Sequence, residues 1–300
     1  MSKIHRIFSL LGDSGGDMNP VWPSGHARML FFLMTFGVVF LFEFAFPLFR
    51  YSQGRLKHST RNLTLTALFL ATNLAVSPAS PYAFEVAGEA RFGMWYWLGL
   101  SPPAQLLLGI AALDLFQYFA HVTLHRWEWS WRLHRVHHCD SEVDVTTTFR
   151  QHPGETLWRI AWHTAAMSAF GISLWVMVIF QTLSAFNAQL RHANVSLPTR
   201  LDRFLRLVLV TANMHKVHHS RHQSEANVNY SNLLSIWDRL GGTYSRGPQF
   251  EKLRYGLDGF DDERKQSLGG LLRMPFVKSW DQPRVIVERE CDRSLASSRI

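Results

Sequence analysis

The sequence predicts an all-α, polytopic membrane helical bundle with a helical cap on its cytoplasmic side. Three observations predict this fold class: four long apolar stretches, a basic loop between the first two, and histidines crowded into the polar part of the chain. Apolar residues make up 47% of the 300 positions and charged residues 18%, yet the mean hydropathy is only -0.05. Apolar residues that are clustered in a chain of intermediate mean hydropathy indicate a membrane protein with a large polar part.

Four stretches are long and apolar enough for a bilayer, which a helix crosses in about 20 residues. They are 29–49, whose one acid is Glu43, and 62–84, 92–113 and 160–190, which carry no Asp, Glu, Lys or Arg. A buried helix of a soluble protein would explain one such stretch, but four in one chain favour membrane spans. We therefore expect transmembrane helices within 29–113, after a polar N-terminal segment over 1–28.

The loop after the first stretch sets the orientation. It contains four basic residues and no acid, namely Arg50, Arg55, Lys57 and Arg61. Loops rich in Lys and Arg remain in the cytoplasm, so the third stretch would bring the chain back to that side. We expect an integral, multi-pass membrane protein whose polar region, from residue 114 onward, lies on the cytoplasmic face.

The third stretch contains its own helix start. Ser101 is followed by Pro102 and Pro103; a hydroxyl can cap a helix, and proline fits its first position. On a helix that begins there, four side chains share one stripe, namely Asp114, Tyr118, His121 and His125. His121 would lie about 30 Å along the axis, at the opposite membrane face.

The fourth stretch, 160–190, is too long for one crossing, because a single helix would measure about 46 Å against a hydrocarbon core of about 30 Å. Gly171 and Ser173 lie near its middle. If the histidines on both sides of this stretch share one site, the chain must return to the side that it left, as a full hairpin or a re-entrant segment. After residue 245 the chain is polar and predicts a cytoplasmic tail over 246–300.

Histidine is the most informative residue type. Fifteen histidines against two cysteines exclude a disulfide scaffold and thiolate zinc fingers. The grouped ones form His121-x-x-x-His125, His134-x-x-His137-His138 and His215-x-x-His218-His219, with His192 standing apart. Imidazole suits iron, zinc and copper, and eight or nine grouped histidines exceed what one metal accepts. The region 114–245 therefore predicts a His-rich dinuclear metal site held by the cap.

The groups and their surroundings resemble the fatty acid hydroxylase and sterol desaturase superfamily of integral-membrane di-iron enzymes. The resemblance covers about 111–246. Beyond the histidine groups it includes Trp131-Arg132-Leu133, Asp144-Val145-Thr146-Thr147, Arg150-x-His152-Pro153-x-Glu155, His192-Ala193-Asn194, Asn229-Tyr230 and Trp237-Asp238-Arg239-Leu240. The chain departs from the family pattern at Val122, Cys139 and Gly241, and no departure touches a grouped histidine.

The resemblance implies a ligand set. The expected ligands are His121, His125, His134, His137, His138, His192, His215, His218 and His219. Residues expected to orient the imidazoles are Asp114, Tyr118, Asp144, His152, Glu155, Asn194 and Asn229. We expect no catalytic residue beyond the metal ligands. The remaining histidines are expected to lie outside the site: His5, His26, His58, His163 and His222.

The implied activity is O2-dependent oxidation of an unactivated C–H bond in a lipid, which could be fatty acyl, alkyl-glycerol or sterol-like. Hydroxylation and desaturation both remain open. The expected cofactors are two Fe ions, which zinc can replace during purification. Electrons are expected from a separate reductase or redox carrier, because the chain has no Gly-x-Gly-x-x-Gly fingerprint and no haem domain.

Four basic residues lie near the last histidine group: Arg200, Arg203, Arg206 and Lys216. They would attract anionic headgroups or an acidic redox carrier, or simply form a positive-inside flank. The net charge of +8 is spread over juxtamembrane loops without a basic cluster interleaved with aromatics, which argues against nucleic-acid binding.

Two other functions compete. A membrane metal transporter or buffer would also be His-rich, but it would require acids within its spans, where only Glu43 and Asp114 qualify. Zinc-dependent hydrolysis would require an open coordination position, and two His triplets plus further histidines leave few.

Overall fold

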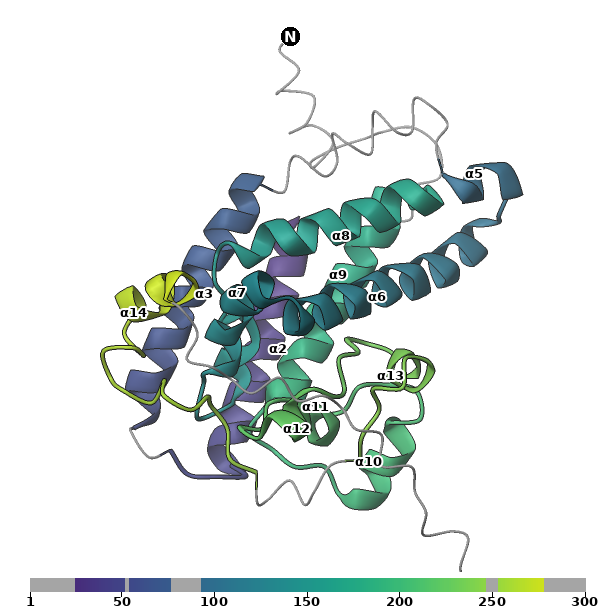
Figure 1. The fold of residues 1–300 in the computed structure, drawn as a ribbon. Coiled ribbons are helices and arrows are strands. Elements are labelled where there is room, and N and C mark those ends of the chain that lie inside the picture. Colours follow the sequence, from purple (N-terminus) through teal and green to yellow (C-terminus); the bar gives the residue numbers. More distant parts are fainter. Residues whose placement is uncertain (1–24, 52–53, 77–92, 247–252, 278–300) are drawn as a thin grey trace, which may run out of the picture.

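The structure, a computed structural model, describes residues 25–51, 54–76, 93–246 and 253–277 (Figure 1). Within these ranges all regular elements are helices. Pairing of the β type is limited to two isolated bridges, Leu209–Leu234 and Ser220–Tyr255. The predicted all-α class is confirmed. Most of the expected N-terminal segment and residues 278–300 of the expected tail lie outside the described residues.

Two described helices are long and apolar enough to cross a membrane: α2 (Gly25–Ala45) and α6 (Pro102–Arg126). α2 begins four residues before the predicted stretch. The other stretches differ from single spans. Helix α3 (Arg55–Val76) begins in the basic loop and is described only as far as Val76, and the stretch 92–113 is divided between α5 (Met94–Leu98) and α6.

Helix α6 begins where the sequence predicts, at Pro102 after Ser101. The expected side-chain cap is not formed, because the Ser101 hydroxyl makes no capping hydrogen bond. The prolines therefore determine this start, since Pro102 and Pro103 lack the N–H groups that a first turn would leave unpaired.

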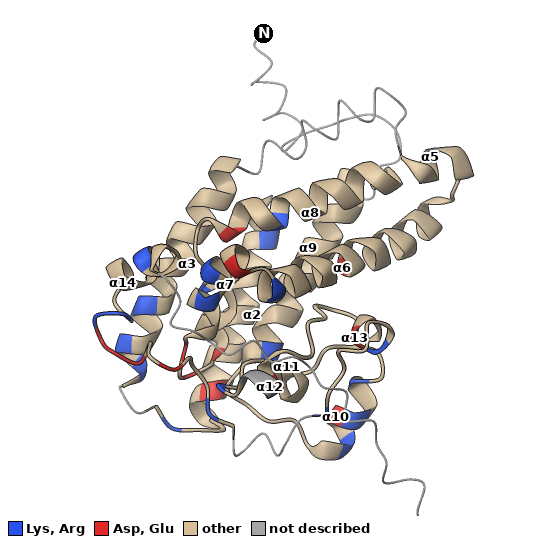
Figure 2. Cartoon of the chain, viewed as in Figure 1, with Lys and Arg blue, Asp and Glu red and all other residues tan. Residues whose placement is uncertain are grey.

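An apolar arm extends from the body of the molecule (Figure 1). It consists of α5, the first half of α6, α8 (Glu155–Phe170) and α9 (Leu174–His192). Its core includes Trp95, Leu113, Met167, Ile172 and Phe180, all at most 6% exposed. Figure 2 shows no charged residue on the outer half of this arm.

The long apolar stretch 160–190 is divided by a turn at Gly171, which has φ 72°. α8 ends at Phe170 and α9 begins at Leu174. Gly93 packs directly against this turn. A Cβ added at Gly93 would lie 2.4 Å from the Gly171 backbone. The chain thus leaves the histidine-rich region along α8 and returns to it along α9, and both helices pack against α6.

The histidine-rich region lies at the base of the arm (Figure 1). Its elements are α7 (Glu128–His138), η1 (Val145–Phe149), α10 (Thr199–Leu205), α11 (Ala212–His218), α12 (Gln223–Ala226) and α13 (Ile236–Leu240). α7 packs against α6 and α8, α11 packs against α9, and η1 packs against α3 and α9. Long helices therefore present their inner ends to two short histidine helices.

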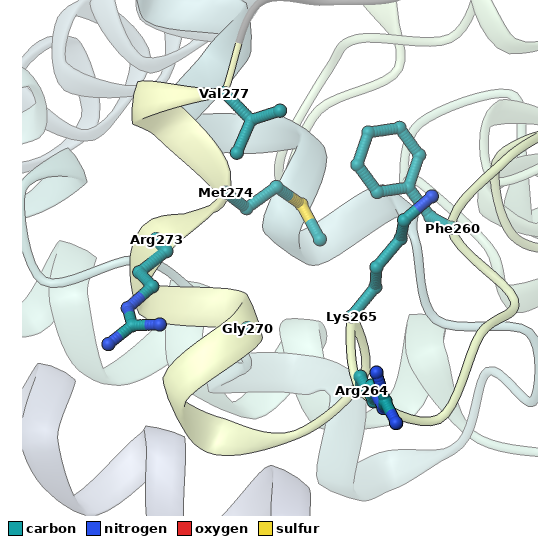
Figure 3. Close-up of a pocket in the computed structure, with 7 residues that line it drawn as sticks. All are labelled: Phe260, Arg264, Lys265, Gly270, Arg273, Met274 and Val277. Carbon is teal, nitrogen blue, oxygen red and sulfur yellow. The ribbon is translucent and has the colours of Figure 1, made fainter.

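Part of the expected polar tail is folded against this region. α14 (Leu268–Arg273) and η3 (Met274–Phe276) bury Leu271 and Met274 against Val136. Arg135 donates to the carbonyl oxygens of Met274 and Val277. A pocket of about 240 Å³ lies at this junction, lined by Phe260, Arg264, Lys265, Gly270, Arg273, Met274 and Val277 (Figure 3). Residues 253–277 are thus part of the packed body.

Candidate metal centre

All nine expected ligands converge on two places. One group contains His121, His125, His134, His138 and His218, and the other contains His137, His192, His215 and His219. Within each group the ligand atoms all lie within 4.8 Å of one another. The part of the chain that the structure describes therefore offers two metal positions, one with five imidazoles and one with four.

Each His-x-x-His-His triplet is shared between the two groups. In α7, His134 and His138 join the group of five, whereas His137 joins the group of four. The second triplet is divided in the opposite sense, because His218 joins the group of five. Consecutive residues of a helix point about 100° apart, so neighbouring histidines such as His137 and His138 reach different positions.

The two groups share a wall. The rings of His138 and His219, one from each group, are stacked with centroids 4.6 Å apart and an interplanar angle of 18°. His215 and His218 are likewise nearly parallel, with centroids 5.2 Å apart. Imidazole rings of the two groups are therefore in direct contact, as expected for a dinuclear site.

The ring nitrogens in the group of four point at one another. His192 Nε2 lies 3.1 Å from His137 Nε2 and 3.0 Å from His215 Nε2. His219 Nε2 lies 3.2 Å from His215 Nε2. Two nitrogens that bind one metal at about 2.1 Å and at right angles are about 3 Å apart. The spacing suits a common cation.

Backbone carbonyls fix which nitrogen is free. His121 Nδ1 lies 2.7 Å from Tyr230 O, His192 Nδ1 lies 2.8 Å from Ala188 O, and His218 Nδ1 lies 2.8 Å from Val228 O. A carbonyl accepts only, so in each pair Nδ1 carries the proton and donates. The lone pair is then on Nε2, the atom that faces the group.

Several of these nitrogens have no hydrogen-bond partner. Among the described residues none bonds to the buried Nε2 atoms of His125, His138 and His218. A buried lone pair without a donor is unfavourable, and a bound metal would satisfy all three. Neutral imidazoles without carboxylate ligands suit iron, zinc or copper, so the donor set fits the expected metal.

Burial favours the metal-binding form of the imidazoles. It lowers the pKa of His137, His138, His215 and His219 well below the ordinary value, and the neighbouring imidazoles lower it further. Burial is also the main reason that the pKa of His218 falls to about 3. These five imidazoles are therefore neutral at physiological pH, with lone pairs available.

Glu155 is the one expected orienting residue that contacts a grouped histidine. Its Oε2 lies 3.1 Å from His134 Nδ1, and its Oε1 accepts from Arg159 Nε at 2.8 Å. Burial raises the pKa of Glu155, but His134 and Arg159 outweigh it and bring the pKa to about 2. The carboxylate is thus ionised and holds the ring of His134 with Nε2 toward His121, at 3.1 Å.

The other expected orienting residues bond elsewhere. Asp114 accepts from the backbone N–H groups of Leu233 and Leu234, at 3.0 and 2.8 Å. Tyr118 pairs with Thr243 at 3.1 Å. In place of contacting imidazoles, these two α6 residues hold the segment that carries Tyr230, whose carbonyl fixes His121.

The remaining four also act on the backbone. Asp144 caps η1, and Asn194 bonds to both backbone groups of Phe49. Asn229, at φ 55°, accepts from Ser245 N at 2.9 Å and donates to Met214 O at 3.2 Å. His152 Nδ1 accepts from Gly154 N at 3.0 Å. Within the described ranges, none of these four side chains forms a hydrogen bond to a grouped histidine.

The rings of Tyr230 and Trp131 also border the group of five, although sequence analysis did not single them out. Tyr230 contacts His121, His125 and His218 with centroids 5.0 to 5.7 Å apart. Trp131 lies 5.0 Å from His125 and 5.5 Å from His138. Both are in the motifs that carry the resemblance, and for Trp131 its place one turn before His134 was the available signal.

A buried polar network lies behind the first triplet. His58, expected to be a bystander, lies 2.8 Å from Asp140. Asn62 donates to Asp140 at 2.9 Å and accepts from Arg150 at 2.7 Å. Burial raises the pKa of Asp140, but His58 and Arg150 bring it below the ordinary value. This network ties α3 to the end of α7.

One expectation about charged residues is wrong, and the two acids within the predicted spans have structural roles. Lys216 is fully buried and donates to Ala193 O at 2.7 Å, so it belongs to no basic surface. Glu43 accepts from the backbone of Asn194 at 2.6 Å and of Val145 at 2.8 Å. Because Glu43 and Asp114 both hold fixed backbone groups, neither forms part of an ion pathway, which argues against transport.

Gly241, one departure from the family pattern, has a steric cause. A Cβ added there would lie 2.0 Å from the Tyr118 hydroxyl oxygen and 2.9 Å from Tyr118 Cζ. The position therefore cannot hold a larger side chain unless Tyr118 moves.

Comparison with known proteins gives a consistent picture. The family model described as fatty acid hydroxylase matches residues 106–243. An ornithine lipid hydroxylase of Rhizobium tropici is 29% identical over 250 residues, which cover 81% of this chain and 73% of that protein. No solved structure matches significantly.

Two further relatives match about half of the chain. Alkylglycerol monooxygenases of Xenopus tropicalis and Homo sapiens are 29% and 28% identical over 155 and 151 residues. The matches cover 50% and 48% of this chain, but only about a third of those proteins, 32% and 31%.

Proposed function

The chain belongs to the fatty acid hydroxylase superfamily, and from this premise we propose that it is an integral-membrane di-iron oxygenase that hydroxylates an alkyl chain of a lipid. It would use O2 and electrons from a separate donor protein. Lipid hydroxylation is the activity that its relatives' names carry. The proposal adds the two irons, the oxygen requirement and the substrate.

One observation carries the proposal: nine imidazoles, eight of them buried, in groups of five and four with no carboxylate in either group. A transporter would require ligands that release the ion, but backbone carbonyls hold the rings of His121, His192 and His218 in place. A hydrolytic zinc site requires three ligands and an open position. Two adjoining, nitrogen-rich positions favour redox metals, and bound iron would supply the activation of O2.

The protein's own residues hold this site in three ways. The backbone carbonyls of Tyr230, Ala188 and Val228 accept from Nδ1 of His121, His192 and His218, respectively. This leaves Nε2 of each ring for the metal. Glu155 does the same for His134 through its carboxylate. The rings of Tyr230 and Trp131 border the group of five, and their apolar faces would limit the access of water to it.

The substrate class follows from the relative that matches most of both chains. The Rhizobium protein is named for ornithine lipid, so we propose a polar acyl lipid as substrate, ahead of an alkylglycerol. The expected hydroxylation forms a C–OH bond from a C–H bond, with one oxygen atom of O2 incorporated and the other reduced to water by two external electrons and two protons. Desaturation would instead remove two hydrogen atoms.

We propose that the arm lies in the membrane and that the histidine groups lie at its cytoplasmic face. The support is the length and composition of α2 and α6 and the uncharged outer half of α8 and α9. The basic loop from Arg50 to Arg61 gives the orientation. A lipid could then reach the site without leaving the bilayer.

Lipid mass spectrometry tests the proposal. Cells that produce ornithine lipid are compared with and without this chain, under O2 enriched in heavy oxygen. We expect a lipid that has gained one heavy oxygen atom, and a chain with His137→Ala should give none. An unchanged lipid profile would contradict the proposed substrate, and a loss of two hydrogen atoms would replace hydroxylation by desaturation.

A further inference from the structure

An exposed apolar surface lies on the histidine-rich body, outside the arm. It comprises Leu201, Phe204, Leu207, Val208, Ile236 and Leu240, which we name the α10–α13 face. Phe204 is 70% exposed, Leu207 63% and Leu240 73%. Large contiguous apolar patches are rare on soluble surfaces and mark contacts with a partner or a membrane.

Backbone bonds make this face one surface. Ser235 N donates to Val208 O at 2.9 Å, and Val210 N donates to Leu233 O at 2.9 Å. The guanidinium of Arg239, in α13, donates to Arg206 O at 2.7 Å. α10 and α13 are therefore held together, and their apolar side chains form a fixed patch.

Hydrogen bonds to α6 fix the position of α13 and so its depth in the proposed membrane. Asp114 lies midway along α6, about 18 Å from each end at 1.5 Å per residue. It accepts from Leu233 N, Leu234 N and, at 2.9 Å, from Trp237 Nε1. The segment that begins α13 is thus fastened to the middle of a helix long enough to cross a bilayer. Since Asp114 precedes His121, expected at the membrane face, by seven residues or about 10 Å of helix, Ile236 and Leu240 would meet acyl chains just inside that face.

The charge on α10 complements a lipid surface. Arg200 and Arg203 are exposed. Asp202, the acid of this helix, is buried and accepts from Thr211 at 2.6 Å and from Arg206. Apolar side chains with an outward positive charge are typical of segments that lie in the interface of an anionic membrane.

We infer that the α10–α13 face is seated in the membrane interface, with its apolar side chains among acyl chains and with Arg200 and Arg203 at anionic headgroups. The inference rests on the proposed membrane location of α6. It places the loop that carries Tyr230 between the lipid and the group of five, since Asp238 of α13 accepts from Tyr230 N at 2.7 Å. The arm is then not the only part of the chain in contact with lipid.

A depth measurement tests this inference. A polarity-sensitive fluorophore is attached to single cysteines, Phe204→Cys or Leu240→Cys, in full-length protein whose Cys291 is replaced by serine. The labelled protein is placed in nanodiscs of mixed neutral and anionic lipids, with or without brominated acyl chains. Leu107→Cys, at a 70% exposed site of α6, reports lipid contact. Glu263→Cys, at an exposed surface ion pair with Lys57, reports water.

We expect bromine quenching at Phe204 and Leu240 close to that at Leu107. Quenching at both positions as weak as at Glu263, with Leu107 still quenched, would overturn the inference and leave the membrane location of α6 intact. Weak quenching at Leu107 as well would overturn both. As a second readout, Arg200→Glu combined with Arg203→Glu should reduce quenching at Phe204 in anionic but not in neutral nanodiscs, and an equal response in both would contradict the headgroup contact.

Discussion

His137 and His138 are consecutive in the chain, yet their imidazoles belong to different groups. Their ring planes are nearly perpendicular, at 89°, with centroids 5.4 Å apart. His138 joins the group of five and His137 the group of four. One turn of α7 therefore contributes to both metal positions, and the last triplet does the same from α11.

This division predicts that single substitutions affect one metal at a time. His137→Ala should remove the metal of the four-histidine group and leave the other largely bound, whereas His138→Ala should affect the group of five. The smaller group has fewer ligands to spare, so His137→Ala should lose metal more completely. Metal analysis per chain measures this, with His163→Ala, a buried histidine against Phe180, as control. Equal loss of both metals in each variant would contradict the division.

The contact between Glu155 and His134 predicts a partial loss of metal affinity when the charge of Glu155 is removed. Glu155→Gln keeps the size of the side chain but removes the charge that holds His134, so we expect metal affinity of the group of five to fall about 10–100-fold. The matched control is Glu128→Gln, since Glu128 pairs with Arg132 at the surface of α7. Competition with a chelator measures the affinity. An unchanged affinity in Glu155→Gln would show that backbone carbonyls alone orient the rings.

The buried network predicts a stability effect separate from metal binding. Arg150→Met leaves the Asn62 and Gln266 side-chain oxygens without their donor and removes a charge near Asp140. We expect the free energy of unfolding to fall by about 3–5 kcal/mol. The exposed Arg132→Met should cost less than about 1 kcal/mol. Denaturant unfolding in detergent compares the two, and similar costs would contradict a structural role for the network.

Gly241 and Tyr118 should be energetically coupled. Gly241→Ala places a methyl group against the Tyr118 ring and should cost about 1–3 kcal/mol, as other overpacked sites do. Adding Tyr118→Phe removes the hydroxyl and should recover part of that loss. Unfolding of the two single variants and the double variant gives the coupling. Strictly additive costs would show that the hydroxyl does not restrict this position.

Much of the site could be predicted from the sequence because the ligands are close together along the chain. The spacing of His134, His137 and His138 identifies them as a unit without any tertiary information. The hairpin could likewise be predicted, since 31 uncharged residues with Gly171 at their centre have few other solutions. The start of α6 followed from Pro102 and Pro103.

The features that could not be predicted from the sequence depend on tertiary contacts. Asp114 shares a stripe with His121, but an acid buried beside free backbone N–H groups binds those groups first. His58 lies far from the triplets in the chain, and only the packing of α3 on η1 brings it to Asp140. Residues 253–277 are polar on average, and the burial of Leu271 and Met274 could not be deduced from composition.

The central claim is that the nine histidines hold two iron ions, five imidazoles around one and four around the other. Metal analysis of the chain purified without oxygen after loading with iron tests it most directly. We predict two iron ions per chain, and one per chain in His219→Ala. A single iron per chain in the unaltered protein, together with full lipid hydroxylation, would contradict the account.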